Sequence, residues 1–229
     1  MNLHGIGPAQ GFWGLLTDTE QAALLALGRM SVFPPGATIC VEGDPATHLF
    51  VLVDGWVKIL AVTSEGQELV LALRGHGDVI GEVAGETTGY RTATVQAIDT
   101  VRSLIVGHEK FGSFLDTQPG ASHAYRRVFT QRWSDTATLL RSRSVTTGAQ
   151  RLAGLLIDLA ARHGHQVNGG IHVAMPLSQE ELASLAGTSR ATVTRALTNW
   201  RDRGFIRTGQ RRIMITDLPG LRQAAGQRT

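Results

Sequence analysis

Two groups of residues in this 229-residue chain have the types and spacing that phosphate-containing ligands require. The first group is Gly81-Glu82, followed nine residues later by Arg91-Thr92. An arginine, a hydroxyl and backbone N–H groups can bind a phosphate, and a carboxylate can accept a hydrogen bond from a ribose hydroxyl. The alternative is a purely structural Glu82–Arg91 ion pair, because a charge buried in a β domain is costly without a partner.

The second group is the segment 189–195, Ser-Arg-Ala-Thr-Val-Thr-Arg, which is followed by a basic hairpin. A DNA-recognition helix reads bases with its N-terminal residues, and arginine is the common bidentate partner of guanine. The alternative is an ordinary surface helix beside a solvated hairpin. The predicted DNA contacts on this helix and hairpin are Ser189, Arg190, Thr192, Thr194, Arg195, Arg211 and Arg212.

The elements around this second group predict a winged helix-turn-helix. Ser178 and Glu181 form a capping-box sequence that opens a helix over residues 179–186, and Gly187 suits its end. Ser189 can cap a second helix over about residues 190–203. Two short helices joined by a tight glycine-containing turn are typical of DNA-binding domains, and the next residues predict a hairpin that would form the wing.

The elements around the first group predict a β domain. From Ser31 to about Val106, short β-rich runs alternate with glycine-containing turns. Many short strands at regular spacing are typical of a jelly roll or barrel. Short helices are predicted over residues 13–29 and 108–118. No glycine-rich nucleotide loop of the GxGxxG or GxxxxGK[ST] type occurs.

Between the two regions, residues 121–143 predict a long helix with a narrow stripe of spaced residues. The stripe consists of Tyr125, Phe129, Trp133, Thr136 and Leu140, at spacings of four, four, three and four. A narrow stripe on a long helix predicts a dimer seam. The alternative is packing of this helix against the chain's own β domain. Residues 146–148 interrupt the pattern and predict a hinge.

Charge is distributed unevenly between the two parts of the chain. Residues 1–140 carry nine basic and fourteen acidic side chains, whereas residues 141–229 carry thirteen basic and five acidic ones. Their formal charges are therefore −5 and +8. A basic C-terminal part beside an acidic body indicates a module that binds a polyanion.

Composition excludes several other classes of protein. With 42% apolar and 18% charged residues, the chain can form a core. The single cysteine, Cys40, excludes an internal disulfide and a four-cysteine zinc or iron–sulfur site within one chain. No apolar run has the length of a membrane span, and the first residues do not resemble a secretory signal. We therefore expect a cytoplasmic protein without membrane contact.

A frame of glycines also crosses the β-rich segment, at Gly36, Gly43, Gly55, Gly77 and Gly81. This frame, the Gly-Glu…Arg-Thr-Ala cassette and the Ser-Arg-x-Thr-Val-x-Arg segment resemble, in this order, one family of bacterial transcription regulators. It is the cyclic-AMP receptor protein and fumarate–nitrate reductase regulator (CRP/FNR) family. The resemblance extends from about residue 12 to residue 217.

The resemblance implies roles for individual residues. In cyclic-nucleotide-binding members, the glutamate holds the ribose, and the arginine with its following hydroxyl holds the cyclic phosphate. The ligand contacts implied here are Gly81, Glu82, Val83, Arg91, Thr92 and Thr136. In the best-known member a threonine–serine pair on the long helix contacts adenine, whereas this chain has Thr136-Ala137. That member also has a glutamate where this chain has Ala191, so we expect the DNA site to differ in part.

Together these observations predict an α+β protein. An N-terminal antiparallel, jelly-roll-like β-roll for cyclic nucleotide is expected over residues 1–119. A long dimerisation helix with a hinge should follow over residues 120–145, and a winged helix-turn-helix over residues 146–229. The predicted dimer interface consists of Tyr125, Phe129, Trp133 and Leu140. We expect no catalytic residues, no metal and no cofactor.

The predicted function is a homodimeric transcription regulator whose DNA affinity is modulated by a cyclic mononucleotide, with cyclic AMP favoured. The expected partners are double-stranded DNA with a pseudo-palindromic site, a second copy of the chain, and RNA polymerase. One alternative is a regulator of the same family that is controlled by another ligand, a partner or its own concentration. Another is the regulatory subunit of an enzyme, although residues 141–229 contain no recognisable catalytic arrangement.

Overall fold

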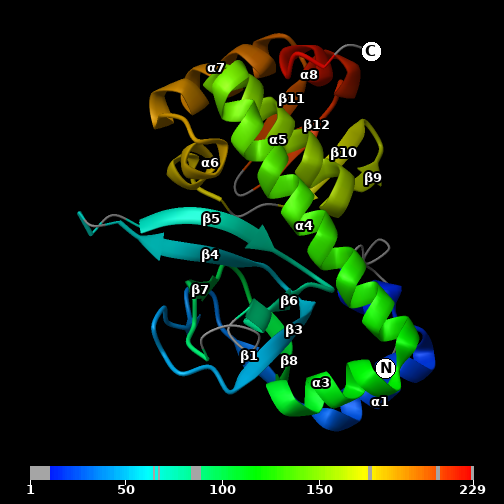
Figure 1. The fold of residues 1–229 in the computed structure, drawn as a ribbon. Helices are drawn as coiled ribbons and strands as arrows, with labels where there is room; N and C mark the ends of the chain where they lie inside the picture. The colour runs from blue at the N-terminus through cyan, green and yellow to red at the C-terminus, as the bar shows by residue number, and fades with distance from the viewer. Residues whose placement is uncertain are drawn as a thin grey trace. The chain divides into compact units, whose positions relative to one another are not determined.

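The computed structural model describes residues 11–227 apart from residues 64, 67, 84–88, 175–176 and 210–211, and it excludes the side chains of residues 135–145, 162–163 and 174. The chain forms two compact units, an N-terminal unit of residues 1–134 and a C-terminal unit of residues 135–229. The division falls inside the long helix α4 (Pro119–Val145), which spans the predicted helix (Figure 1). Of the helices that the structure describes, none combines the length and hydropathy needed to cross a membrane.

Two four-stranded antiparallel sheets form the body of the N-terminal unit. Their strand orders are β1-β8-β3-β6 and β2-β7-β4-β5. The strands are β1 (Arg29–Phe33), β2 (Thr38–Cys40), β3 (His48–Asp54), β4 (Val57–Val62), β5 (Glu68–Arg74), β6 (Val79–Ile80), β7 (Thr94–Ala97) and β8 (Val101–Gly107). This arrangement confirms the predicted antiparallel β domain and adds the short strand β6, which the sequence did not indicate.

Strand β3 connects two hydrophobic clusters because its side chains alternate between the faces of its sheet. Phe50 and Leu52 pack with residues of both sheets, whereas Leu49 and Val51 pack with the helices that cover the other face. These helices are η1 (Phe12–Leu15), α1 (Asp18–Leu27), α3 (His108–Thr117) and the first turns of α4. Each large side chain buried in this way contributes about 1.5–3 kcal/mol.

The first turns of α4 belong to this core, and Tyr125 of the predicted dimer seam lies within it. Tyr125 is only 9% exposed, and its ring lies 5.4 Å from that of Phe111 and 4.8 Å from that of Phe129. Tyr125 is thus buried within its own chain, as the alternative interpretation stated. Trp133, two turns later, is 79% exposed. The side chains of Thr136 and Leu140 lie outside the described residues.

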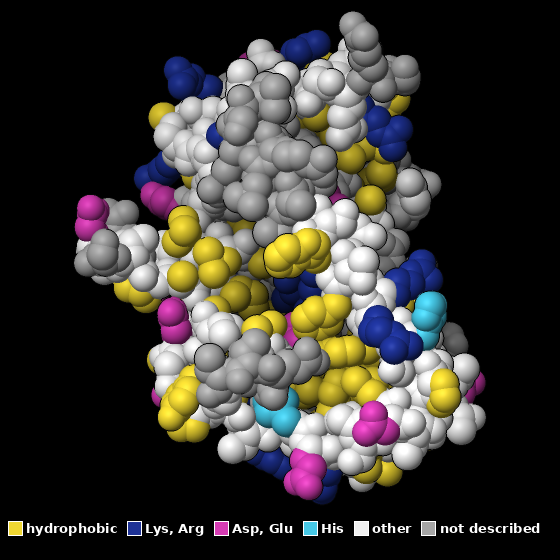
Figure 2. Space-filling model, in the orientation of Figure 1, with side chains coloured by type: hydrophobic (Ala, Val, Ile, Leu, Met, Phe, Trp, Pro, Cys, Tyr) yellow, Lys and Arg dark blue, Asp and Glu magenta, His cyan; other side chains and the backbone are white. Residues whose placement is uncertain are grey.

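A second exposed apolar surface lies on the hairpin of β4 and β5. Val70 points into the core and is 6% exposed, whereas its neighbours Leu69 and Leu71 are 40% and 47% exposed. The alternation of a strand places Leu69 on the opposite face of the sheet from Val70, whereas Leu71 lies where the register of β4 and β5 shifts. Figure 2 shows hydrophobic side chains gathered over this hairpin.

The C-terminal unit combines four helices with a small antiparallel sheet of order β11-β12-β10-β9. Its elements after α4 are α5 (Gly148–His163), β9 (His165–Val167), β10 (Gly170–Ala174), α6 (Gln179–Ala186), α7 (Arg190–Asp202), β11 (Ile206–Gly209), β12 (Arg212–Ile215) and α8 (Leu218–Ala224). Helices α6 and α7 form the predicted helix-turn-helix, and β11 with β12 form the predicted hairpin.

Local sequence determines the ends of these helices. The predicted capping box is present at α6. The Ser178 side chain accepts from the Glu181 backbone N–H, and the Glu181 carboxylate accepts from the Ser178 backbone N–H. Gly187 ends α6 in the left-handed region at φ 59°, and Ser189 caps α7. At the predicted hinge, Thr147 also forms a capping box and opens α5.

Candidate ligand site and nucleic-acid interface

Arg91 is a buried cation in the N-terminal unit, with an exposed fraction of only 5%. Its backbone is fixed by hydrogen bonds to both Gly43 and Asp44 in the turn after β2. Its Nη1 donates to the carbonyl oxygen of Gly81 over 3.4 Å, and its guanidinium lies 5.3 Å from the centre of the Phe50 ring. The structure therefore brings Gly81 and Arg91 together.

Gly81 is a position where a side chain would disturb this arrangement. Its backbone has a φ of +80°, which L-residues rarely adopt. A β-carbon there would collide with Nη1 of Arg91. Glycine at this position therefore permits both the turn and the close approach of the guanidinium.

Arg91 has no carboxylate partner among the described residues, since none of their ion pairs includes it. The alternative of a structural Glu82–Arg91 pair is therefore wrong for the described structure. Burial, followed by the positive charge of Arg91, lowers the pKa of the neighbouring His48. A buried guanidinium without a counter-charge in the described residues is suited to hold an anionic group.

Glu82 is also buried, at 7% exposed, but its partner is Arg132 of α4. Nη1 of Arg132 lies 2.6 Å from Oε1 of Glu82, and its Nη2 lies 2.9 Å from Oδ1 of Asp78. Burial raises the pKa of Glu82, and the charge of Arg132 opposes that rise. The carboxylate that the sequence assigns to a ribose hydroxyl is thereby connected to the long helix.

The sequence did not indicate Arg132 or Asp78. One signal was present, because Arg132 is three residues after Phe129 and so lies on the side of the helix that packs on the sheets. Among the other predicted ligand contacts, Val83 is 39% exposed and Thr92 is exposed. The side chain of Thr136 lies outside the described residues.

Helix α7 in the C-terminal unit has one buried and one exposed face. The buried face consists of Val193, Ala196, Leu197 and Trp200. Arg190, Thr194 and Arg195 are exposed in the first turns. The hydroxyls of Ser189 and Thr192 lie 3.0 Å apart at the cap, so these two predicted DNA contacts also hold the start of the helix.

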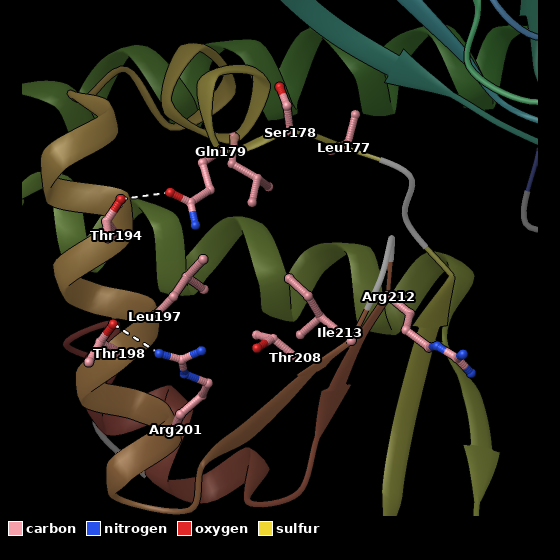
Figure 3. A pocket seen from close by; sticks show the side chains of 12 residues that line it. Leu177, Ser178, Gln179, Thr194, Leu197, Thr198, Arg201, Thr208, Arg212 and Ile213 are labelled. Atoms are coloured by element: carbon pink, nitrogen blue, oxygen red, sulfur yellow. Dashed lines mark hydrogen bonds between the residues drawn. The ribbon is translucent and has the colours of Figure 1, made fainter.

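A cleft of about 390 Å³ lies between α6, α7 and the β11–β12 hairpin (Figure 3). Leu182, Leu197 and Ile213 are among its apolar lining residues, and Thr194, Thr198 and Arg201 are among its polar ones. Arg212 also lines the cleft, although its guanidinium points away from α7 (Figure 3). Arg211, the other predicted wing contact, lies outside the described residues.

Two side chains at the start of α6 contact the exposed face of α7. Oε1 of Glu180 lies 3.0 Å from Nη1 of Arg190. One turn further along α7, Thr194 donates its hydroxyl to Oε1 of Gln179 over 2.6 Å. The sequence did not indicate these contacts of Gln179 and Glu180, although both residues occupy the first turn of the first helix of the helix-turn-helix.

Comparison with known protein families gives matches in both units. Residues 30–118 match the model of the cyclic nucleotide-binding domain, and residues 150–224 match the model of the Crp-like helix-turn-helix domain. A CRP-like cAMP-activated global transcriptional regulator from Mycobacterium tuberculosis is 33% identical over 215 residues. That alignment covers 93% of this chain and 96% of the relative. The cyclic AMP receptor protein of Thermus thermophilus is 27% identical and covers 93% of this chain and 95% of its own.

Solved structures agree with this fold. A CRP-family transcriptional regulator from Thermus thermophilus superposes with a TM-score of 0.71 at 25% identity, covering 86% of this chain and 97% of its own. FixK2 from Bradyrhizobium japonicum superposes with a TM-score of 0.76 at 19% identity, covering 88% and 99%, and supports the fold alone. This family consists of transcription regulators and not of enzymes. The chain belongs to the CRP/FNR family of DNA-binding transcription regulators and carries its cyclic nucleotide-binding domain.

Proposed function

We propose that the protein is a homodimeric regulator whose affinity for DNA rises when a cyclic mononucleotide, cyclic AMP, binds in the N-terminal unit. The observation that carries this proposal is Arg91, a 5% exposed cation without a carboxylate partner among the described residues. A cyclic phosphate supplies one negative charge and two acceptor oxygens, which match a guanidinium fork. The similarity to a cAMP-activated relative at 33% identity favours cyclic AMP among such ligands.

Glu82 supports a ribose as the second part of the ligand. As a carboxylate it can accept a hydrogen bond from the ribose 2′-hydroxyl through an oxygen that Arg132 leaves available. Because Arg132 belongs to α4, a ligand that contacts Glu82 would alter an ion pair of the long helix. A ligand shifts the protein toward the DNA-binding state only if it binds that state better, and we propose that this contact is where the two states differ.

The exposed apolar surface of the N-terminal unit supports a dimer. Trp133 on α4 is 79% exposed, and Leu71 on β5 is 47% exposed. A large indole in water is unfavourable, and burying it against a second copy would remove that cost. In the proposed dimer α4 pairs with its counterpart through Trp133 and Leu140, and Phe129 borders the contact.

Two recognition helices in such a dimer would read a pseudo-palindromic duplex with half-sites about 34–36 Å apart. Arg190, Thr194 and Arg195 are proposed to face the bases, whereas Arg212 is proposed to contact phosphates. Such a protein acts on chromosomal DNA together with RNA polymerase, so we place it in the cytoplasm.

Calorimetry with the full-length protein tests the sensor part of this proposal. The titrants are cyclic AMP, cyclic GMP, cyclic di-GMP and, as the control without a cyclic phosphate, 5′-AMP. We expect binding of cyclic AMP that exceeds binding of the other three. Binding of none of them would overturn the sensor proposal, and selective binding of cyclic di-GMP would replace the ligand by a dinucleotide.

A further inference from the structure

Arg190 and Glu180 form an ion pair at the surface of the helix-turn-helix that stability alone does not explain. Their side chains are 66% and 67% exposed, and the Nη1–Oε1 distance is 3.0 Å. Exposed pairs of this kind have little effect on folding. The contact therefore matters for where it places the guanidinium of Arg190.

Helix dipoles explain why a carboxylate is needed at this point. Arg190 is the first residue of α7, where the helix presents the positive end of its dipole. A cation is unfavourable there, and Glu180 offsets this effect from the first turn of α6, where a carboxylate is favoured. Because Glu181 closes the capping box with Ser178, Glu180 is the acidic residue of this turn that is left to contact α7.

The contact leaves the base-reading donors of Arg190 in place. A guanidinium has five N–H donors, and Glu180 accepts from Nη1 alone. The edge formed by Nε and Nη2 can still donate to O6 and N7 of a guanine. Thr194, one turn along the same face, donates a hydrogen bond to Gln179 in a similar way (Figure 3).

We propose that Glu180 is a positioning residue for base readout, which holds Arg190 toward guanine and weakens contacts of this surface with backbone phosphates. This inference rests on the proposed DNA-binding role of Arg190. Holding the side chain in one orientation reduces the rotamer entropy that Arg190 loses when it binds a base. The negative charge of Glu180 lowers the affinity for any duplex, irrespective of sequence. The first effect increases the ratio of specific to non-specific binding, whereas the second lowers both affinities alike.

The test uses the full-length protein, a duplex selected from random sequences, and the same duplex with the guanine read by Arg190 replaced by each other base. Glu180→Gln removes the charge, and Glu180→Asp keeps the charge but shortens the side chain. Asp202→Asn at the other end of α7 is the control for loss of one exposed acidic charge in the same helix pair. Thermal unfolding of each variant is measured alongside binding.

We expect Glu180→Gln to reduce the preference for that guanine by about threefold to tenfold, a part of the discrimination that a bidentate pair provides. It should bind scrambled DNA more tightly than wild type. Glu180→Asp should lose the base preference without the gain on scrambled DNA, and Asp202→Asn should keep the preference. In an Arg190→Ala background, Glu180→Gln should change the base preference no further, because it acts through Arg190.

An unchanged base preference in Glu180→Gln, with wild type still selective, would overturn this inference and leave the proposed function standing. The same holds if the Glu180→Gln effect persists at full size in the Arg190→Ala background. A wild-type protein that binds all duplexes equally would instead overturn the DNA-reading role itself, and with it the inference.

Discussion

Arg132 of the long helix is bound to Glu82, fifty residues earlier in the chain, with 2.6 Å between Nη1 and Oε1. The contact joins the carboxylate of the proposed ligand site to the helix that we propose forms the dimer. Arg132 also contacts Asp78 at 2.9 Å, so one guanidinium holds two carboxylates. Any ligand group that engages Glu82 acts on an existing connection to α4.

The Arg132–Glu82 contact predicts a pH-dependent stability in one variant. Arg132→Gln leaves Glu82 buried without its cation, so the free energy of unfolding should fall by about 3 kcal/mol at neutral pH. Burial already raises the pKa of Glu82, and loss of Arg132 removes the largest of the effects that oppose this rise. A carboxyl whose pKa is higher in the folded state stabilises the fold below its unfolded pKa, and this stabilisation is lost as the pH rises through the folded pKa.

Denaturant unfolding over a pH series measures this effect. Relative to wild type, Arg132→Gln should therefore lose less free energy of unfolding at about pH 5 than at neutral pH, where Glu82 must ionise. The double variant with Glu82→Gln is the control, since it has no carboxyl to titrate at this position. Equal loss at both pH values in the single variant would show that Glu82 does not respond to Arg132.

Trp133 provides the test of the proposed dimer. Trp133→Glu would place an unpaired charge in the α4 interface, so the dimer dissociation constant should rise by about a hundredfold or more. Gln131→Glu adds the same charge on a different face of the helix, where it is exposed, and should leave the dimer intact. Sedimentation at micromolar concentration distinguishes these results, and an unchanged Trp133→Glu dimer would place the interface elsewhere.

Arg151 is predicted to stabilise the helix-turn-helix. It donates through Nε to the carbonyl of Ala186 over 2.8 Å and through Nη2 to that of Gly187 over 2.6 Å, at the end of α6. Arg151→Ala should lower the free energy of unfolding of the C-terminal unit by about 2–3 kcal/mol. Arg151→Lys should restore little, because an ammonium lacks the fork that reaches both carbonyls. Full stability of the lysine variant would contradict this assignment.

Arg195 and Arg212 should differ in what they contribute to DNA binding. Arg195→Ala should cost about 1–3 kcal/mol on the preferred site and relax the preference at one base pair. Arg212→Ala should weaken preferred and scrambled DNA nearly equally and reduce the salt slope by about one unit. Binding measured on both duplexes at two salt concentrations separates the two roles. Equal losses on both duplexes for Arg195→Ala would reduce it to a phosphate contact.

Local patterns in the sequence predicted most of the fold, because they depend on neighbouring residues. The capping box of Ser178 and Glu181 and the left-handed Gly187 involve residues only a few positions apart. The strand β6 has only two residues, too few for alternation to reveal it. The burial of Tyr125 depends on Phe12 and Phe111, which the fold brings to α4 from distant positions.

In the candidate sites too, contacts within a local motif were predictable and contacts between distant segments were not. The pairing of Gly81 with Arg91 was foreseeable, since both lie in one recognisable cassette. The partner of Glu82 was not, because its identity depends on how α4 packs on the sheets rather than on spacing. Glu180 was missed for a similar reason, since the angle between α6 and α7 decides which side chains meet.

Titration of a labelled preferred duplex, with and without saturating cyclic AMP, tests the central claim most directly. Wild type and Lys110→Ala, which removes an exposed cation of the same unit, should gain about tenfold in DNA affinity with cyclic AMP. Arg91→Ala should bind cyclic AMP about ten- to a hundredfold more weakly and lose this response at concentrations that saturate wild type. A wild-type affinity that is the same with and without the nucleotide, or a full response in Arg91→Ala, would contradict the account.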